Sequence, residues 1–176
     1  MTSDEQINKA VRDAVNLVFG SGFAIRAKQS QAPMPTSPHA SVHVSNHVPI
    51  GYHEAQATES GLNLSYNTDI YTVATVFVNF FYDAAFDNAR LFYSALLRDD
   101  IQHVFKSENM EMLKRSRARN LQKVQNSQWI EQAVITIDVS YVATDSYTVG
   151  TIGEANITHD FNGEINILNI NLDGEE

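Results

Sequence analysis

Four histidines near the N-terminal third of the chain could bind a transition metal, since imidazole nitrogens are common metal ligands. They lie within and just after the segment QAPMPTSPHASVHVSN (31–46): His39, His43, His47 and His53. A spacing of four would align them on a helix, but the prolines and alternating valines favour an extended strand. On a strand four residues span roughly 13 Å, whereas zinc needs its nitrogen ligands at about 2.0–2.1 Å. We therefore expect solvent-facing histidines and no metal site, with His47 and His53 paired across a turn as the remaining alternative.

The acidic residues do not form a convincing catalytic pair. Asp99 and Asp100 follow a predicted helix. Asp69 and Asp83 flank a predicted strand. A catalytic carboxyl pair needs one acid in an apolar setting that raises its pKa, so helix caps and turns explain these residues better. The chain also has no cysteine and no serine-nucleophile motif, and GSG at 20–22 lacks the lysine and the spacing of a phosphate-binding loop. We therefore predict no enzymatic activity and no cofactor.

Length and composition are those of one folded domain. The chain has 176 residues, of which 43% are hydrophobic and 19% are charged, so a single domain covering 1–176 is expected. The first ten residues, MTSDEQINKA, are polar and acidic, so we expect no signal peptide. No apolar run approaches the roughly 18 residues that span a bilayer.

Charge is distributed unevenly along the chain, which carries a net charge of −9. Residues 106–123 contain six basic and two acidic groups, whereas residues 124–176 contain nine acidic groups and no basic one. The total argues against a general nucleic-acid binder. Within the basic segment we define a basic strip: Lys114, Arg115, Arg117, Arg119 and Lys123. It could be a solvated face, a contact with the acidic surface of a partner subunit, or a contact with DNA phosphates. On one continuous strand, its three arginines would form a row.

Hydrophobic periodicity predicts the first helices and strands. An amphipathic helix is expected at 3–18, where Ser3 and Gln6 resemble a capping box, and a short strand at 23–28. After the prolines, apolar and polar residues alternate along the chain, which predicts a strand with one buried face. Its predicted inner residues are Ala40, Val42, Val44, Val48 and Ile50, and its predicted outer residues are His39, Ser41, His43, Ser45 and His47.

The centre of the chain reads as a strand followed by a helix. The segment 70–82, IYTVATVFVNFFY, has apolar residues at both odd and even positions. We therefore expect helices to bury one face of this strand and a second layer or a neighbouring subunit to bury the other. Asp83 is expected to cap a helix at 84–97. The predicted inward residues of this helix are Ala85, Ala89, Phe92 and Leu96.

The remaining segments complete the sheet. Residues 99–115 predict a short helix followed by a loop, and 129–142 predict a strand. Residues 51–68 are weakly strand-like and suggest a hairpin, while Asn162–Gly163 is a strong turn signal between the last two strands. The inner residues predicted for the 129–142 strand are Trp129, Ala133, Ile135, Ile137, Val139 and Tyr141. The fold class is therefore α+β, with a mostly antiparallel sheet and helices packed on one face.

Over residues 4–172 the chain resembles the neck and tail-terminator proteins of tailed bacteriophages. The resemblance follows the order of the segments: the helix QINKAVRDAVNLVF, the lead-in QAPMPTSPHASVHV, the aromatic strand and helix TVATVFVNFFYDAAFDNARLFYSALLRD, the tryptophan-led RNLQKVQNSQWIEQAVITIDVSYV and the closing INILNINL. The polar 51–68 segment and the long 148–163 hairpin depart from the family pattern.

The resemblance implies a structural protein of the virion, assembled in the host cytoplasm. Six copies would form a ring that caps the tail tube and joins it to the head–neck connector. The implied partners are other copies of the chain, a tail tube protein, and a neck, head-completion or adaptor protein. DNA would pass through the channel without sequence-specific binding, and no membrane is involved. The resemblance carries over no catalytic residue.

Two other functions stay open on the sequence. One is another head–tail joining or adaptor protein. The other is a small cone-shaped α+β ligand-binding protein or enzyme, with a pocket lined by Tyr71, Trp129, Tyr141 and Asp138. A further expectation concerns the proline arm, residues 31–38 with Pro33, Pro35 and Pro38. Because proline restricts the backbone, we expect an ordered arm at a subunit contact or at the rim of a ring.

Overall fold

The computed structural model describes residues 4–27, 35–51, 54–60, 63–121, 123–125, 128–150, 154–161 and 164–171. The chain divides into two compact units. Unit 1 contains Met1–Tyr52 and Ile70–Ala143, and unit 2 contains His53–Asp69 and Thr144–Glu176. Strands β4 (Asn63–Phe81) and β9 (Gln132–Gly150) contribute residues to both units.

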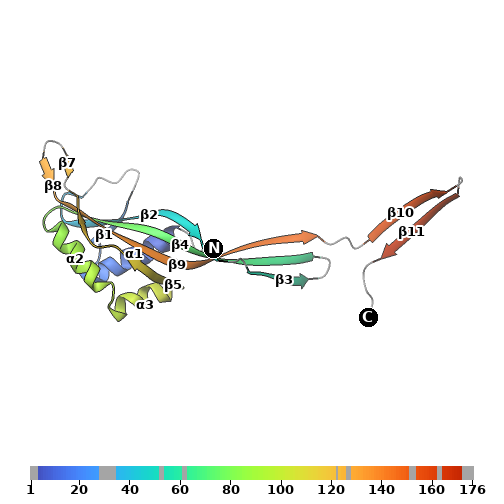
Figure 1. Ribbon diagram of the computed structural model, residues 1–176, viewed down its shortest axis with the longest axis horizontal. Coiled ribbons are helices and arrows are strands. Elements are labelled where there is room, and N and C mark those ends of the chain that lie inside the picture. Colours follow the sequence, from blue (N-terminus) through green and yellow to red (C-terminus); the bar gives the residue numbers. More distant parts are fainter. Residues whose placement is uncertain are drawn as a thin grey trace. The chain divides into compact units, whose positions relative to one another are not determined.

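Unit 1 contains a sheet and three helices, which confirms the predicted α+β class (Figure 1). The helices are α1 (Asp4–Phe19), α2 (Ala85–Ala95) and α3 (Asp99–Ser107). The other strands of unit 1 are β1 (Ala24–Arg26), β2 (His39–Pro49), β5 (Met110–Arg115), β6 (Arg119–Asn120), β7 (Lys123–Gln125) and β8 (Gln128–Ile130). The strand order is β1-β2-β4-β9-β5, with β6 also pairing with β9. Only the β1–β2 pair among the described registers is parallel.

The helices cover one face of this sheet. Along β4 every second side chain from Ala74 to Phe80 is fully buried, and the residues between them are partly exposed. The predicted inward residues of α2 are all buried, as are the predicted inner residues of β9 from Ala133 to Tyr141. The second face of β4, which we call the outer face of the sheet, is partly exposed in the single chain. Helix α1 supplies the buried stripe Ile7, Ala10, Val11, Ala14 and Val15.

A bulge corrects the predicted faces of β2. The register with β4 shifts between Val44 and Asn46, so one extra residue interrupts the alternation. Beyond it every side chain points to the opposite face from the one predicted. Val48 and Ile50 are therefore exposed, at 47% and 44%, instead of buried, while His47 lies on the helix-covered face, opposite Ala74.

The start of α2 also differs from the prediction. Ala84 occupies the cap position with a positive φ of 60°, and no side chain caps the helix there, so Asp83 does not act as the cap. A carboxylate from a distant segment takes this place, since the backbone N–H of Phe86 donates to Glu131 Oε1 at 3.3 Å. The carbonyl of Glu131 also accepts from the N–H of Tyr82 at 2.9 Å. The start of α2 is therefore held by tertiary contacts.

Two further predictions are corrected for segments that pair with β9 or precede it. Residues 110–115, predicted as a loop, form strand β5, which pairs with β9. Trp129, predicted inside, lies in the β7–β8 hairpin and is 74% exposed. The chain leaves strand geometry at Glu131, so the alternation of β9 does not extend back to the tryptophan.

Unit 2 contains only strands among its described residues. Strand β3 (Glu54–Ser60) pairs antiparallel with the first part of β4, and β10 (Glu154–Phe161) pairs antiparallel with β11 (Glu164–Asn171). The strand pairing of both predicted hairpins is confirmed, whereas the predicted Asn162–Gly163 turn lies outside the described residues.

Candidate functional site

The basic strip lies at one edge of the unit 1 sheet. Strands β5 and β6 both pair with β9, with Arg115 opposite Ile137 and Arg119 opposite Val134. Among the described strands, none pairs with the other side of β5. The edge therefore presents backbone N–H and C=O groups without strand partners in the part of the chain that the structure describes.

The arginines of the strip do not share one role. The chain is not in a strand at 116–118, so the continuous strand required for an arginine row does not form. The guanidinium of Arg115 lies over the ring of Tyr93, with Cζ 4.1 Å from the ring centroid, and Nη1 donates to the Tyr93 carbonyl. Arg115 is thus committed to packing against α2. Arg117 is exposed.

Three other cations remain available near this edge. Lys106, Lys114 and Arg119 are exposed, and no ion pair links any of them, or Arg117, to a described residue. Because unpaired surface cations can bind a partner without first breaking an internal bond, Lys114, Arg117 and Arg119 are the accessible part of the strip, and Lys106 is a further accessible cation outside it. Lys123 belongs to β7, and its side chain lies outside the described residues.

The proline arm is described only at its end. Pro33 lies outside the described residues, whereas Pro35 is partly exposed and Pro38 is exposed. Pro38 immediately precedes β2, which β4 and β9 separate from β5 in the sheet order. The proline arm is therefore connected to β2, whereas the basic strip lies at the other side of the sheet order, at β5.

The histidines do not converge on one point among the described residues, and no group of three or more metal-ligating side chains occurs there. The prediction that His39 and Ser41 face solvent is wrong, since both are buried. The ring of His39 stacks on Phe81 with the ring centroids 5.0 Å apart. His53 lies outside the described residues. Nε2 of His47 lies 2.7 Å from Asp4 Oδ1, and Nδ1 lies 2.8 Å from the hydroxyl of Tyr141.

This His47 bridge joins α1, β2 and β9. A carboxylate only accepts hydrogen bonds, so with neutral imidazole Nε2 carries the proton and Nδ1 accepts from Tyr141. Burial, with the Asp4 carboxylate adding to it, raises the pKa of the Tyr141 hydroxyl above its ordinary value. The bridge depends on the β2 bulge, which turns His47 toward the helices, so strand alternation alone could not have found it.

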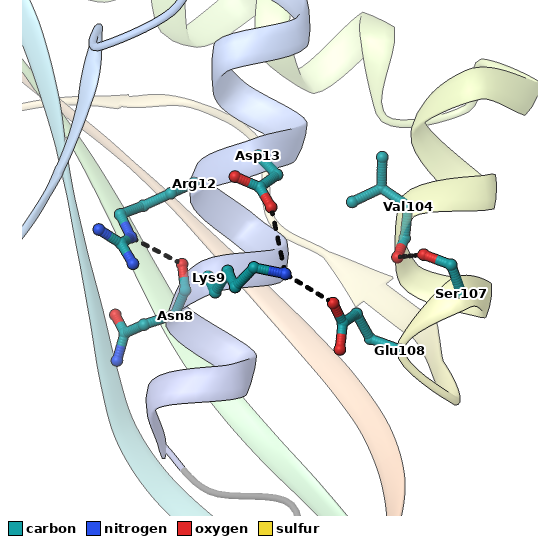
Figure 2. Close-up of polar contacts among 7 residues, drawn as sticks. All are labelled: Asn8, Lys9, Arg12, Asp13, Val104, Ser107 and Glu108. Atoms are coloured by element: carbon teal, nitrogen blue, oxygen red, sulfur yellow. Dashed lines mark hydrogen bonds and ion pairs between the residues drawn. The ribbon is translucent and has the colours of Figure 1, made fainter.

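A second polar connection ties the first helix to the third (Figure 2). Lys9 on α1 donates to Glu108 Oε1 at 2.8 Å, and its Nζ lies 3.9 Å from Asp13 Oδ2. The hydrogen bond to Glu108 raises the pKa of Lys9 above its usual range. Because Lys9 and Glu108 are 99 residues apart, no local sequence pattern indicates the pair. Its position on the protein surface suits helix anchoring rather than catalysis.

Exposed apolar side chains gather at the end of the outer face that lies beyond the bulge. Val48 pairs with Val73, and the N–H of Ile50 donates to the Tyr71 carbonyl at 2.7 Å, so these residues lie side by side. Val142 follows the buried Tyr141 on β9 and is exposed. We call Val48, Ile50, Tyr71 and Val142 the apolar patch. Sequence reasoning missed it because the bulge was not foreseen.

A hollow of about 360 Å³ adjoins the patch. Its lining residues are Tyr71, Lys106, Asn109, Met110, Glu111, Ser140, Tyr141 and Val142. Of the residues proposed to line a ligand pocket, the structure brings Tyr71 and Tyr141 to this hollow. Asp138 instead accepts a hydrogen bond from Thr75 at 2.9 Å, and Trp129 is in the β7–β8 hairpin.

Comparison with known proteins identifies one family. The model of a family described as phage neck terminator protein matches residues 5–164. The match runs from the first helix through β10. No curated protein matches the chain. None of the described helices is long and apolar enough to cross a membrane.

Proposed function

Because the chain belongs to the phage neck terminator protein family, we propose that it forms a ring at the end of the tail tube. The ring, a hexamer in this proposal, stops polymerisation of the tube protein and joins the tube to the head–neck connector. The match over residues 5–164 is the observation that carries the proposal. The function is mechanical, since the binding surfaces do the work and no catalytic group is required.

The exposed surfaces of unit 1 support assembly. The apolar patch and the β5–β6 edge lie at different places on the sheet. Adjacent exposed apolar side chains and strand edges commonly mark protein interfaces. A ring built by head-to-tail contacts uses two different surfaces of each subunit and covers both when it closes.

The charge distribution supports a channel for DNA. Residues 53–69 and 144–176 contain ten of the 21 acidic residues and none of the 12 basic ones. A ring of chains that each carry a net charge of −9 repels phosphates, so DNA can pass without sequence-specific binding. We place the assembled protein in the virion neck, after assembly in the host cytoplasm.

Inactivation of the gene in the phage tests the proposal. Electron microscopy of lysates is expected to show tubes of uncontrolled length and heads without attached tails, and expression of the protein in trans should restore tails of normal length. Tubes of normal length that fail only to attach to heads would assign the protein to another head–tail joining step and would refute terminator function.

Solution mass tests the ring separately. Sedimentation over a range of protein concentrations is expected to show a closed oligomer of six subunits. A stable monomer at all concentrations, alone and with purified tubes, would contradict the ring. Immunogold labelling of intact virions is expected at the head–tail junction.

A further inference from the structure

The chain places its only tryptophan in an exposed position. Trp129 lies in β8 of the β7–β8 hairpin, opposite Val124, and is 74% exposed; Val124 is 52% exposed. Tryptophan is costly to leave in water and is enriched among residues that dominate binding energy at interfaces. The hairpin therefore presents an apolar projection.

The hollow beside the apolar patch has the properties of a receptor for such a projection. Its volume of about 360 Å³ is within the range of small-molecule pockets, roughly 300–1,000 Å³. Tyr71 and Met110 provide apolar walls. Glu111 provides a carboxylate that can accept the indole N–H, and Lys106 provides an ammonium group that can lie against the ring face.

The projection and the hollow cannot meet within one chain. Trp129 precedes the start of β9, whereas Ser140, Tyr141 and Val142 of the hollow lie near its middle. The ten residue steps from Gln132 to Val142 extend roughly 33 Å along a strand. A contact between them requires two copies of the chain.

The charges of two separate sequence segments favour the same pairing. The segment leading to the hairpin, residues 114–123, contains five basic residues and no acidic one. Residues 144–176, which follow the residues of the hollow in the sequence, contain seven acidic residues and no basic one. Opposite charges on separate segments of the chain favour head-to-tail contacts between copies over contacts between like-charged segments.

We propose that Trp129 of one copy inserts into the hollow beside Tyr71 of the next copy. This contact rests on the proposed ring and names the surfaces that build it. It is heterologous, because each copy gives its hairpin to one neighbour and its hollow to the other. The indole is the central anchor, and the free cations of the basic strip act at its rim.

Single variants test the contact through the association constant measured by sedimentation. Trp129→Ala is expected to weaken association at least about 30-fold, as for a central aromatic anchor. Tyr71→Asp is expected to do the same by placing a charge in the wall of the hollow. Leu97→Ala is the matched control, because Leu97 is an exposed apolar residue, at 64%, at the end of α2. Circular dichroism and thermal unfolding of each variant establish that it is folded.

Mixing the two defective variants gives a sharper result. Each alone should be monomeric, because Trp129→Ala lacks the projection and Tyr71→Asp lacks a working hollow. An equimolar mixture should form dimers and nothing larger, since the intact projection of one variant enters the intact hollow of the other and no further site remains. No association in the mixture, or full rings in it, would overturn the proposed contact.

The wild-type chain separates failure of the contact from failure of the ring. If the wild type is monomeric, the proposed ring fails and this contact with it. If the wild type forms rings and folded Trp129→Ala forms them with the same association constant, only the contact fails. Loss of binding to tail tubes with unchanged rings would assign the hollow to the tube protein and also overturn the contact between copies.

Discussion

Replacement of Arg115 with methionine is expected to destabilise the fold, although this residue belongs to a strip for which the sequence left a solvated face, a partner-subunit contact or a DNA contact open. The substitution keeps the aliphatic stem and removes the guanidinium, which lies 4.1 Å from the Tyr93 ring centroid and donates to the Tyr93 carbonyl. A hydrogen bond to a charged group contributes about 1.5–3 kcal/mol. A cation–π contact contributes about 0.5–2 kcal/mol. Because one guanidinium makes both contacts, we expect a combined loss of about 2–3 kcal/mol.

Thermal unfolding followed by circular dichroism measures this loss. For a chain of this length, 1 kcal/mol corresponds to roughly 2–4 °C, so the Tm should fall by roughly 4–12 °C. Arg117→Met is the control, because Arg117 is exposed and has no ion pair with a described residue, and its effect should stay within about 0.5 kcal/mol. Two protein concentrations separate folding from assembly. Equal stability of the two variants would refute the assignment of Arg115 to packing.

Two further predictions concern the bulge and the tyrosine bonded to the bridging histidine. Deletion of Ser45 removes the extra residue between Val44 and Asn46 and turns His47 away from the helices, so the free energy of unfolding measured in urea should fall by about 2–3 kcal/mol through two lost hydrogen bonds. Ser45→Ala keeps the extra residue and should change the free energy of unfolding by less than about 0.5 kcal/mol. Equal effects of the two variants would contradict the bulge. Burial raises the pKa of Tyr141 above about 10 in the folded state, so the stability that the neutral hydroxyl contributes is complete below that pH and is lost as the pH rises through the folded pKa. The urea midpoint should therefore fall more steeply between pH 9 and pH 11 for the wild type than for Tyr141→Phe. Parallel curves of urea midpoint against pH for the two proteins would count against this linkage.

Most of the core could be predicted from the sequence because its elements carry strong local periodicity. Every second residue of β9 from Ala133 to Tyr141 is buried as the alternation predicts, and α2 buries Phe92 at the centre of its apolar stripe. A period of 2 or 3.6 depends only on backbone geometry, which a short segment already determines. The resemblance to phage terminators rests on the order of these same segments, and the family match over residues 5–164 confirms it.

The positions of the candidate surface residues were less predictable, because they depend on where regular structure is interrupted. One extra residue in β2 exposes Val48 and Ile50 and turns His47 toward α1. The break at Glu131 separates Trp129 from the strand that should have buried it. Interruptions of this kind cost little locally and are stabilised by partners distant in the sequence, so alternation patterns do not reveal them.

The sequence by itself therefore determined the fold class, the buried stripes, the uneven charge and the family resemblance, because each follows from composition or short-range periodicity. Only the tertiary structure decided which members of the basic strip are free. Arg115 and Arg117 share a residue type and a parity, yet the ring of Tyr93, 22 residues earlier, holds the first and leaves the second exposed. The tertiary structure alone also decided where the apolar patch forms, since a surface made from β2, β4 and β9 exists only once those strands pair.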